Sequence, residues 1–182
     1  MDDRQLEAHR AAWQHRGQRR PDFAVTPGAD QESVWDYPRP PAYVADSRAV
    51  VITADHHQIA HSAHSLRALE TGSPPAFYLP SSAFDRALLR PNPQQSFCEW
   101  KGYAQYFDVV TSERVIKAAV WTYPEPLAGA EAIAGYYSCY PEQLDCKVGD
   151  EVVQAQAGSY YGGWVTSELV GPWKGEPGTG HW

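Results

Sequence analysis

The sequence has little positive charge and no long apolar stretch. Its 15 lysine and arginine residues stand against 22 aspartate and glutamate residues, which gives a net charge of −7 at pH 7. Nucleic acids and membranes are bound through basic surfaces, so neither is expected as a partner, although a local pocket could still hold a small anion. No apolar run approaches the roughly 18 residues of a membrane-spanning helix, and residues 1–5 do not resemble a secretory signal. A soluble, cytoplasmic protein is therefore expected, and its oligomeric state stays open.

Cysteine is scarce as well. The three cysteines, Cys98, Cys139 and Cys146, contain no Cys-x-x-Cys pair, and their odd number fits a reducing compartment. Structural zinc sites use four cysteine or histidine ligands, so a structural zinc is not predicted. Cys98 could serve redox chemistry if Lys101 lowered its pKa, but a buried cysteine on a strand is the commoner situation.

The signatures of several enzyme classes are also missing. Gly162-Gly163 is not followed by a helical pattern, so it lacks the setting of a phosphate-binding loop. There is no Gly-x-Ser-x-Gly motif and no close carboxylate pair for metal-dependent nucleotidyl transfer, since Asp145 and Asp150 flank a predicted turn. We therefore predict no catalytic residue and no cofactor, and leave open whether the protein is an enzyme.

Four histidines lie close together in the sequence. On a helix, His57 and His61 would share a face, as would His61 and His64, and such spacing can hold a transition metal. His56 and His57, however, fall in a predicted turn after a strand. Exposed histidines are the simpler interpretation, and we predict no bound metal.

What the sequence does contain is a series of short strand-like runs separated by proline, glycine and polar turns. The clearest are the β-branched run at 48–53 and a hairpin of residues 103–110 and 115–123. Other extended segments are predicted at 33–37, 42–44, 58–60, 76–79, 96–99, 135–140, 150–155 and 160–166. About eight short strands among these segments indicate a mainly β fold, with two packed antiparallel sheets or a rolled barrel.

Helical segments are few. A helix is predicted for residues 3–16, capped by Asp2 or Asp3 and ended by Gly17. Residues 1–30 are interpreted as an N-terminal helical extension of a single β domain at 31–182. Shorter helical segments are predicted at 65–70, 80–89 and 128–134, and the prolines at 91–93 are expected to end the second of them.

The tail at 171–182 is rich in glycine and proline, but its two tryptophans should hold it against the body of the domain. The tripeptide Trp-Lys-Gly occurs twice, at 100–102 and again in this tail at 173–175.

Aromatic residues make up 13% of the chain, with 7 Trp and 11 Tyr. Many of these rings will fill β cores. Two or three that meet at the end of a sheet would form a pocket for a flat heterocycle or for a cation. The candidate ligand-binding residues are Glu70, Tyr78, Trp100, Lys101, Tyr106, Trp121, Tyr136 and Trp164.

Glu70 and Lys101 are the charged members of this set, and each lies in an apolar stretch of sequence. A charge among apolar residues needs a partner or a ligand, because its burial alone is costly. We predict that both point into one cavity, either paired with each other or facing a ligand. The alternative is that both side chains reach solvent along their stems.

Several stretches together resemble a bacterial family called domain of unknown function 427. They are residues 66–71, 74–80, 96–106 and 118–124, and the resemblance extends over 43–147. The tail motif Gly171-Pro172-Trp173-Lys174-Gly175 resembles the longer members. The resemblance implies a compact two-sheet fold of the β-tent type, similar in outline to methionine sulfoxide reductase domains and Mss4-like proteins. Members of this family are sometimes labelled nucleotidyltransferase-like, so the resemblance also implies that activity class.

Three functions follow from these observations. The first expectation is a cytoplasmic β domain that binds a small organic ligand in an aromatic pocket. The second is an enzyme that acts on a nucleotide-like substrate. The third is a protein-interaction module that uses residues 38–41 and the N-terminal helix.

Overall fold

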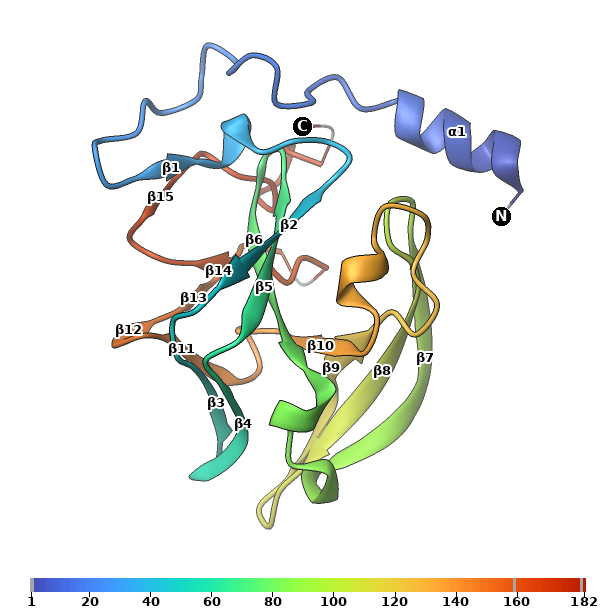
Figure 1. Cartoon of the computed structure of the whole chain (residues 1–182), viewed down its shortest axis with the longest axis vertical. Coiled ribbons are helices and arrows are strands. Elements are labelled where there is room, and N and C mark those ends of the chain that lie inside the picture. The colour runs from blue at the N-terminus through green and yellow to red at the C-terminus, as the bar shows by residue number, and fades with distance from the viewer. Residues whose placement is uncertain (1, 159, 181) are drawn as a thin grey trace.

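The computed structural model describes residues 2–158, 160–180 and 182. Its largest element is an antiparallel seven-stranded sheet that bends between the β5–β6 side and the β7–β8 side (Figure 1). In spatial order its strands are β2 (Ala42–Asp46), β5 (Ser65–Glu70), β6 (Ser73–Pro80), β10 (Tyr136–Cys139), β9 (Val115–Thr122), β8 (Gly102–Val110) and β7 (Leu89–Cys98).

A four-stranded sheet packs against the seven-stranded one. Its strands are β12 (Glu151–Val152), β11 (Asp145–Val148), β3 (Val50–Ala54) and β4 (His57–Ser62). The predicted two-sheet β fold is confirmed, and within the described residues no sheet closes into a barrel. The turn between β3 and β4 holds Asp55 and His56 at positive φ, as a tight two-residue hairpin loop requires.

The main core lies between the two sheets. Strand β3 buries alternate residues, Val50, Ile52 and Ala54, because successive side chains of a strand point to opposite faces. They meet Phe77 of β6 and Trp164, whose rings stack with centroids 5.1 Å apart. The other face of the large sheet carries a second buried cluster, which is rich in tyrosine and tryptophan.

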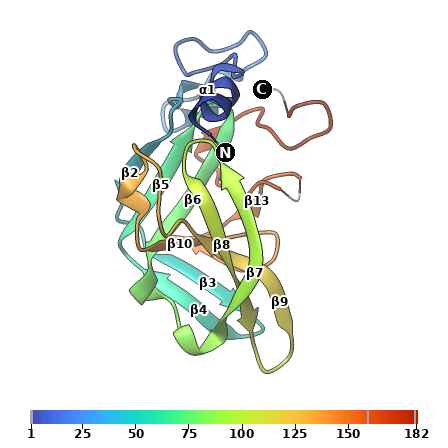
Figure 2. The ribbon, with the colours of Figure 1, turned by 90° about the vertical axis from the view of Figure 1, so that its right-hand side faces the viewer.

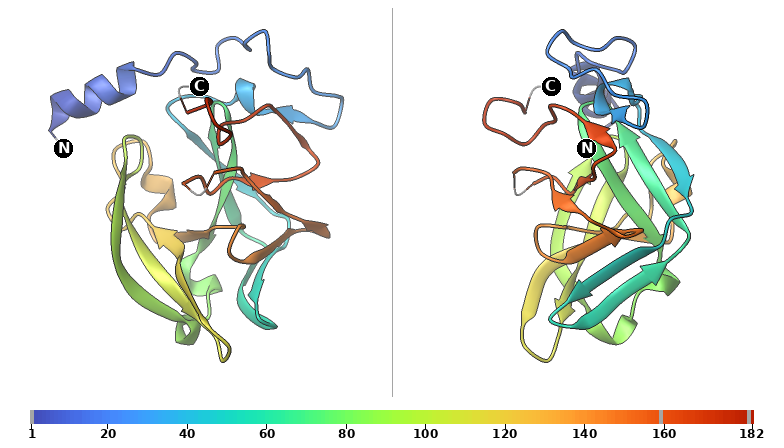
Figure 3. Two further views of the ribbon diagram at one scale, coloured as in Figure 1. Left: turned by 180° about the vertical axis from the view of Figure 1, so that it is seen from behind. Right: turned by 90° about the vertical axis from the view of Figure 1, so that its left-hand side faces the viewer.

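Two short strand pairs complete the fold, and the first of them joins segments that are distant in the sequence. β1 (Glu32–Ser33) runs parallel to β15 (Leu169–Val170), and β13 (Gln154–Ala155) pairs with β14 (Trp164–Val165). The N-terminal and C-terminal segments therefore meet at one end of the molecule (Figure 3). A third apolar cluster, built around Trp35, forms there and includes Trp173 and Trp182. The prediction that the tail packs on the body is confirmed.

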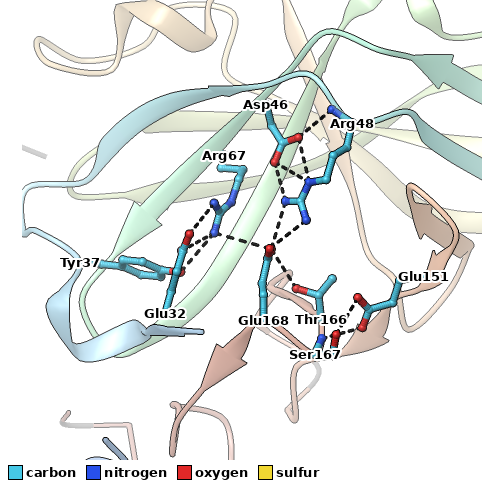
Figure 4. A network of polar contacts seen from close by, with 9 residues as sticks. All are labelled: Glu32, Tyr37, Asp46, Arg48, Arg67, Glu151, Thr166, Ser167 and Glu168. Atoms are coloured by element: carbon cyan, nitrogen blue, oxygen red, sulfur yellow. Dashed lines mark hydrogen bonds and ion pairs between the residues drawn. The ribbon is translucent and has the colours of Figure 1, made fainter. Parts of the chain in front are cut away.

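Ion pairs connect the β1–β15 end of the molecule to the large sheet (Figure 4). Arg67 of β5 pairs with Glu32 of β1 at 2.6 Å, and Arg48 pairs with Glu168 at 2.9 Å. Glu168 precedes β15 and also lies 3.9 Å from Arg67. The network holds the C-terminal segment beside β5, where that segment can contribute to a site.

The helices are short. They are α1 (Asp3–Ala11) and the 3-10 turns η1 (Val34–Asp36), η2 (Ser81–Ala83), η3 (Arg86–Leu88) and η4 (Glu131–Ile133). α1 lies across one end of the molecule (Figure 2) and buries none of its residues. Asp2 caps it in a capping box with Gln5, but it ends at Ala11 and not at residue 16. Beyond that point the chain is no longer helical, and the indole N–H of Trp13 donates a hydrogen bond to the carboxylate of Glu99. Within the described residues, no helix is long and apolar enough to cross a membrane.

Several local predictions were wrong. Residues 65–70 form strand β5, because pairing with β2 and β6 on both sides outweighs their helical propensity. Residues 80–89 form two 3-10 turns in place of a helix. Strand β7 continues through Pro91 and Pro93, which an edge strand with a bulge tolerates because no partner needs the missing N–H groups. In the predicted segment 160–166, only Trp164 and Val165 are in strand β14.

Candidate functional site

A cavity of about 260 Å³ opens beside the second aromatic cluster of the large sheet. Strands β5 to β9 supply one side of it. Trp13 from the N-terminal segment and Lys174 from the tail line it as well. Five of the eight predicted ligand-binding residues line this cavity, namely Glu70, Tyr78, Lys101, Tyr106 and Trp121.

The other three predicted residues lie elsewhere. Trp164 is fully buried in the main core, where its N–H donates to the carbonyl of Cys139 at 3.1 Å. Trp100 lies under Arg10, 5.1 Å from the guanidinium carbon, beside a separate pocket of about 60 Å³. Tyr136 is half-buried at the edge of the aromatic cluster. Alternation along strand β14 explains only Trp164, which faces the core between the sheets, because Trp100 lies in the turn between β7 and β8 and Tyr136 packs at the margin of the aromatic cluster.

The aromatic wall is held in a fixed arrangement. The indole N–H of Trp121 donates to the hydroxyl of Tyr78 at 3.3 Å, and its ring lies 4.5 Å from that of Tyr140. The hydroxyls of Tyr106 and Ser96 are 2.7 Å apart. Burial raises the pKa of Tyr78 to about 12, so its hydroxyl stays protonated and can donate a hydrogen bond at neutral pH.

Charged groups gather at the other side of the cavity. Glu70 lies 3.3 Å from the ammonium of Lys101 and 3.5 Å from the guanidinium of Arg39. Lys174 is only 3% exposed, and its ammonium lies 4.1 Å from the ring centroid of Trp13. Arg39 is also 4.1 Å from that ring, and the indole N–H of Trp13 donates to Glu99 at 2.7 Å. The cluster thus contains three cations, on Arg39, Lys101 and Lys174, and two carboxylates, on Glu70 and Glu99.

Burial disfavours the charged forms of Glu70, Lys101 and Lys174, but the resulting pKa shifts differ from one group to the next. Burial opposes ionisation of both Glu70 and Lys101. It is outweighed at Glu70 by the combined attraction of Lys101, Lys174 and Arg39, and at Lys101 by the attraction of Cys98 and Glu70. The pKa of Glu70 is therefore lowered, and the pKa of Lys101 is raised well above its ordinary value. For Lys174, burial dominates over the attraction of Glu70, and its pKa falls to about 8.

Cys98 lines the same cavity, and its sulfur lies 3.9 Å from the ammonium of Lys101. Burial nevertheless raises the pKa of this thiol, and Lys101 offsets the effect only in part. The thiolate that the redox alternative needs is therefore disfavoured.

The predicted pairing of Glu70 and Lys101 in one cavity is confirmed as geometry. Arg39, Trp13 and Lys174 were not among the predicted site residues. The repeated Trp-Lys-Gly tripeptide was a signal that could have found one of them, because the lysines of both copies, Lys101 and Lys174, line this cavity. Arg39 had no such signal, since its role depends on how the proline-rich segment folds over β5.

The histidines do not form a helical face. His57 and His61 lie on strand β4, and His56 and His64 are exposed in the turns on either side. Within residues 2–158, 160–180 and 182, no group of three or more His, Cys, Asp and Glu side chains is placed to hold a metal ion. The absence of a bound metal stays a prediction.

A comparison with known protein families finds a match for the central part of the chain. A family described as domain of unknown function 427 (DUF427) matches residues 42–151. The protein belongs to the DUF427 family. The DUF427 segment contains Glu70, Lys101 and most of the aromatic wall, whereas Arg39, Trp13 and Lys174 lie outside it. No curated protein matches the chain.

Proposed function

We propose that the protein binds a small, flat organic anion in this cavity. The observation that carries the proposal is the charge arrangement: Arg39, Lys101 and Lys174 approach a cavity whose carboxylates are Glu70 and Glu99. Both carboxylates already have partners, Glu70 in Arg39 and Lys101, and Glu99 in the indole of Trp13. An incoming carboxylate or phosphate would therefore meet the one positive charge by which the three cations exceed the two carboxylates.

The aromatic wall supports a flat ligand. Trp121, Tyr78 and Tyr106 present apolar rings with hydroxyl groups at their edges, which suits stacking together with a few orienting hydrogen bonds. A volume of about 260 Å³ suits a molecule of one or two rings. A cationic ligand, which the aromatic residues alone would also suit, is disfavoured by repulsion from three buried cations.

A matched set of compounds with one ring and different charges tests this proposal. We expect 4-methylbenzoate to bind at least about tenfold more tightly than 4-methylbenzamide or 4-methylbenzylamine, measured by calorimetry or ligand-observed NMR. Nucleoside monophosphates extend the series to a larger flat anion. Lys101→Met should weaken binding of the anion, whereas Lys117→Met, on the exposed face of β9, should not. Preference for the amine would overturn the proposal.

The same assay separates the alternatives. An enzyme that acts on a nucleotide-like substrate would bind a triphosphate only with a divalent metal and would turn it over. A protein-interaction module would bind none of these compounds. Both stay predictions.

A further inference from the structure

Lys174 differs in its surroundings from the other three lysines of the chain. Lys101 is paired with Glu70, Lys117 with Asp108 at 2.8 Å, and Lys147 is exposed. Lys174 is buried, lines the cavity, and among the described residues has no carboxylate within ion-pair distance of its amine. It lies against the faces of Trp13, at 4.1 Å, and Tyr161, at 5.9 Å.

Burial and the neighbouring cations favour the neutral amine, which is the nucleophilic form, whereas the face of Trp13 attracts the ammonium form. Burial and the positive charges of Arg39 and Lys101 lower the pKa of Lys174 to about 8, while Glu70 and Glu99 oppose the shift. About a tenth of such amines are neutral at pH 7, against well below a hundredth for a lysine in water. Desolvation and a neighbouring cation are the two means by which proteins activate lysine for attack on carbonyl carbon.

We propose that Lys174 forms an imine with an aldehyde or ketone that carries an anionic group. The inference rests on the proposed binding of a flat organic anion, and it identifies the carbonyl compounds as the relevant class. The amine lone pair forms the new C–N bond. The C–O bond then breaks, and the oxygen leaves as water with both protons of the neutral amine. No oxidant or reductant takes part.

The anionic group directs the carbonyl toward this amine. Lys101 and Arg39 attract the anion at the side of the cavity where Glu70 lies. The rings of Trp13 and Tyr161 cover the amine and limit the access of water, which would hydrolyse the imine.

Reductive trapping with 4-formylbenzoate tests the proposal on the full chain. The protein is incubated at pH 7 with the aldehyde and cyanoborohydride, digested and mapped by mass spectrometry. We expect saturable modification of Lys174, at least about tenfold faster than that of Lys117 and Lys147, which serve as internal controls. Mapping also separates Lys174 from the N-terminal amine, which reacts near neutral pH. 4-Methylbenzoate, which lacks the carbonyl, should compete, and the neutral 4-formylbenzamide should react more slowly.

The outcomes separate this inference from the proposed function. If 4-methylbenzoate binds but Lys174 is modified no faster than Lys117, the imine is wrong and the anion site stands. If Lys174 reacts equally fast with 4-formylbenzamide, the amine is activated but the anion site is wrong. If neither binding nor selective modification occurs, both proposals fail. Lys174→Arg should abolish trapping, and the mapping of the wild-type protein does not depend on how this variant folds.

Discussion

Glu70 and Lys101 form a buried ion pair across 31 positions of sequence, with 3.3 Å between carboxylate oxygen and ammonium nitrogen. Their side chains are 17% and 11% exposed, and both line the cavity. Glu70 ends strand β5 and Lys101 lies in the turn after β7. The pair therefore connects the two sides of the bent sheet.

The two partners of this pair should differ in their effect on stability. Glu70→Gln leaves Arg39, Lys101 and Lys174 near one another without their central carboxylate. We expect it to lower the free energy of unfolding by about 3–5 kcal/mol. Lys101→Met leaves Glu70 paired with Arg39 and should cost about 1–2 kcal/mol. Urea denaturation measures both, and the reverse order would contradict this description of the charge cluster.

Gly162 should control the size of the cavity. A Cβ atom at this position would clash with the indole of Trp121, so Gly162→Ala must displace that ring. We expect a loss of about 1–3 kcal/mol in stability and weaker binding of 4-methylbenzoate. Gly180→Ala is the matched control, because a Cβ atom there would meet no atom of the described residues within 4 Å. Equal effects of the two substitutions would show that the ring is free to move.

Truncation after Thr166 should destabilise the whole domain. It removes β15 and Trp173, and it takes away the carbonyl of Pro172 that accepts the indole N–H of Trp35 at 2.7 Å. Burial of one large side chain contributes about 1.5–3 kcal/mol, so a fall of about 5–15 °C in melting temperature is expected. Trp182→Ala should cause a smaller fall. An unchanged melting curve would mean that the tail is an independent extension.

Asp108 should make stability depend on pH in the acid range. Burial opposes its ionisation, but bonds from Lys117, Asn92 and the N–H of Ala118 hold its pKa at about 2. An aspartate in the unfolded chain titrates near 3.9. Because the folded pKa is the lower one, Asp108 stabilises the protein above about pH 4, and this contribution is lost as the pH falls from about 4 to 2.

Asp108→Asn tests that assignment. It should cost about 2 kcal/mol at pH 7, and its difference from the wild type should shrink between pH 4 and pH 2 in urea titrations. Asp150→Asn, at an exposed turn, should show no such trend. A difference that stays constant over this range would contradict the assignment.

The β fold was predictable because its signals are local. The β-branched run before Ala54 and the hairpin around residues 111–114 specify strands by their own composition. β5 was mistaken for a helix because Leu, Arg, Ala and Glu favour helices, and only pairing with β2 and β6 overrides that preference.

The site was predictable only in part, for a similar reason. Glu70 and Lys101 are conspicuous as charges among apolar residues. Trp164 looked equivalent to Trp121, but a strand sends alternate side chains to opposite faces, and which face each ring takes depends on the register of strand pairing, which composition alone does not specify. Lys174 reaches the cavity only because the tail is folded back over the sheet.

The parallel pairing of β1 with β15 has a consequence for the order of assembly. A chain synthesised as far as Val152 contains every strand of both sheets, yet it lacks β15 and Lys174. The cavity is therefore completed late, when the last segment docks beside the first. We expect a bound ligand that contacts Lys174 to hold this last segment against the body of the domain.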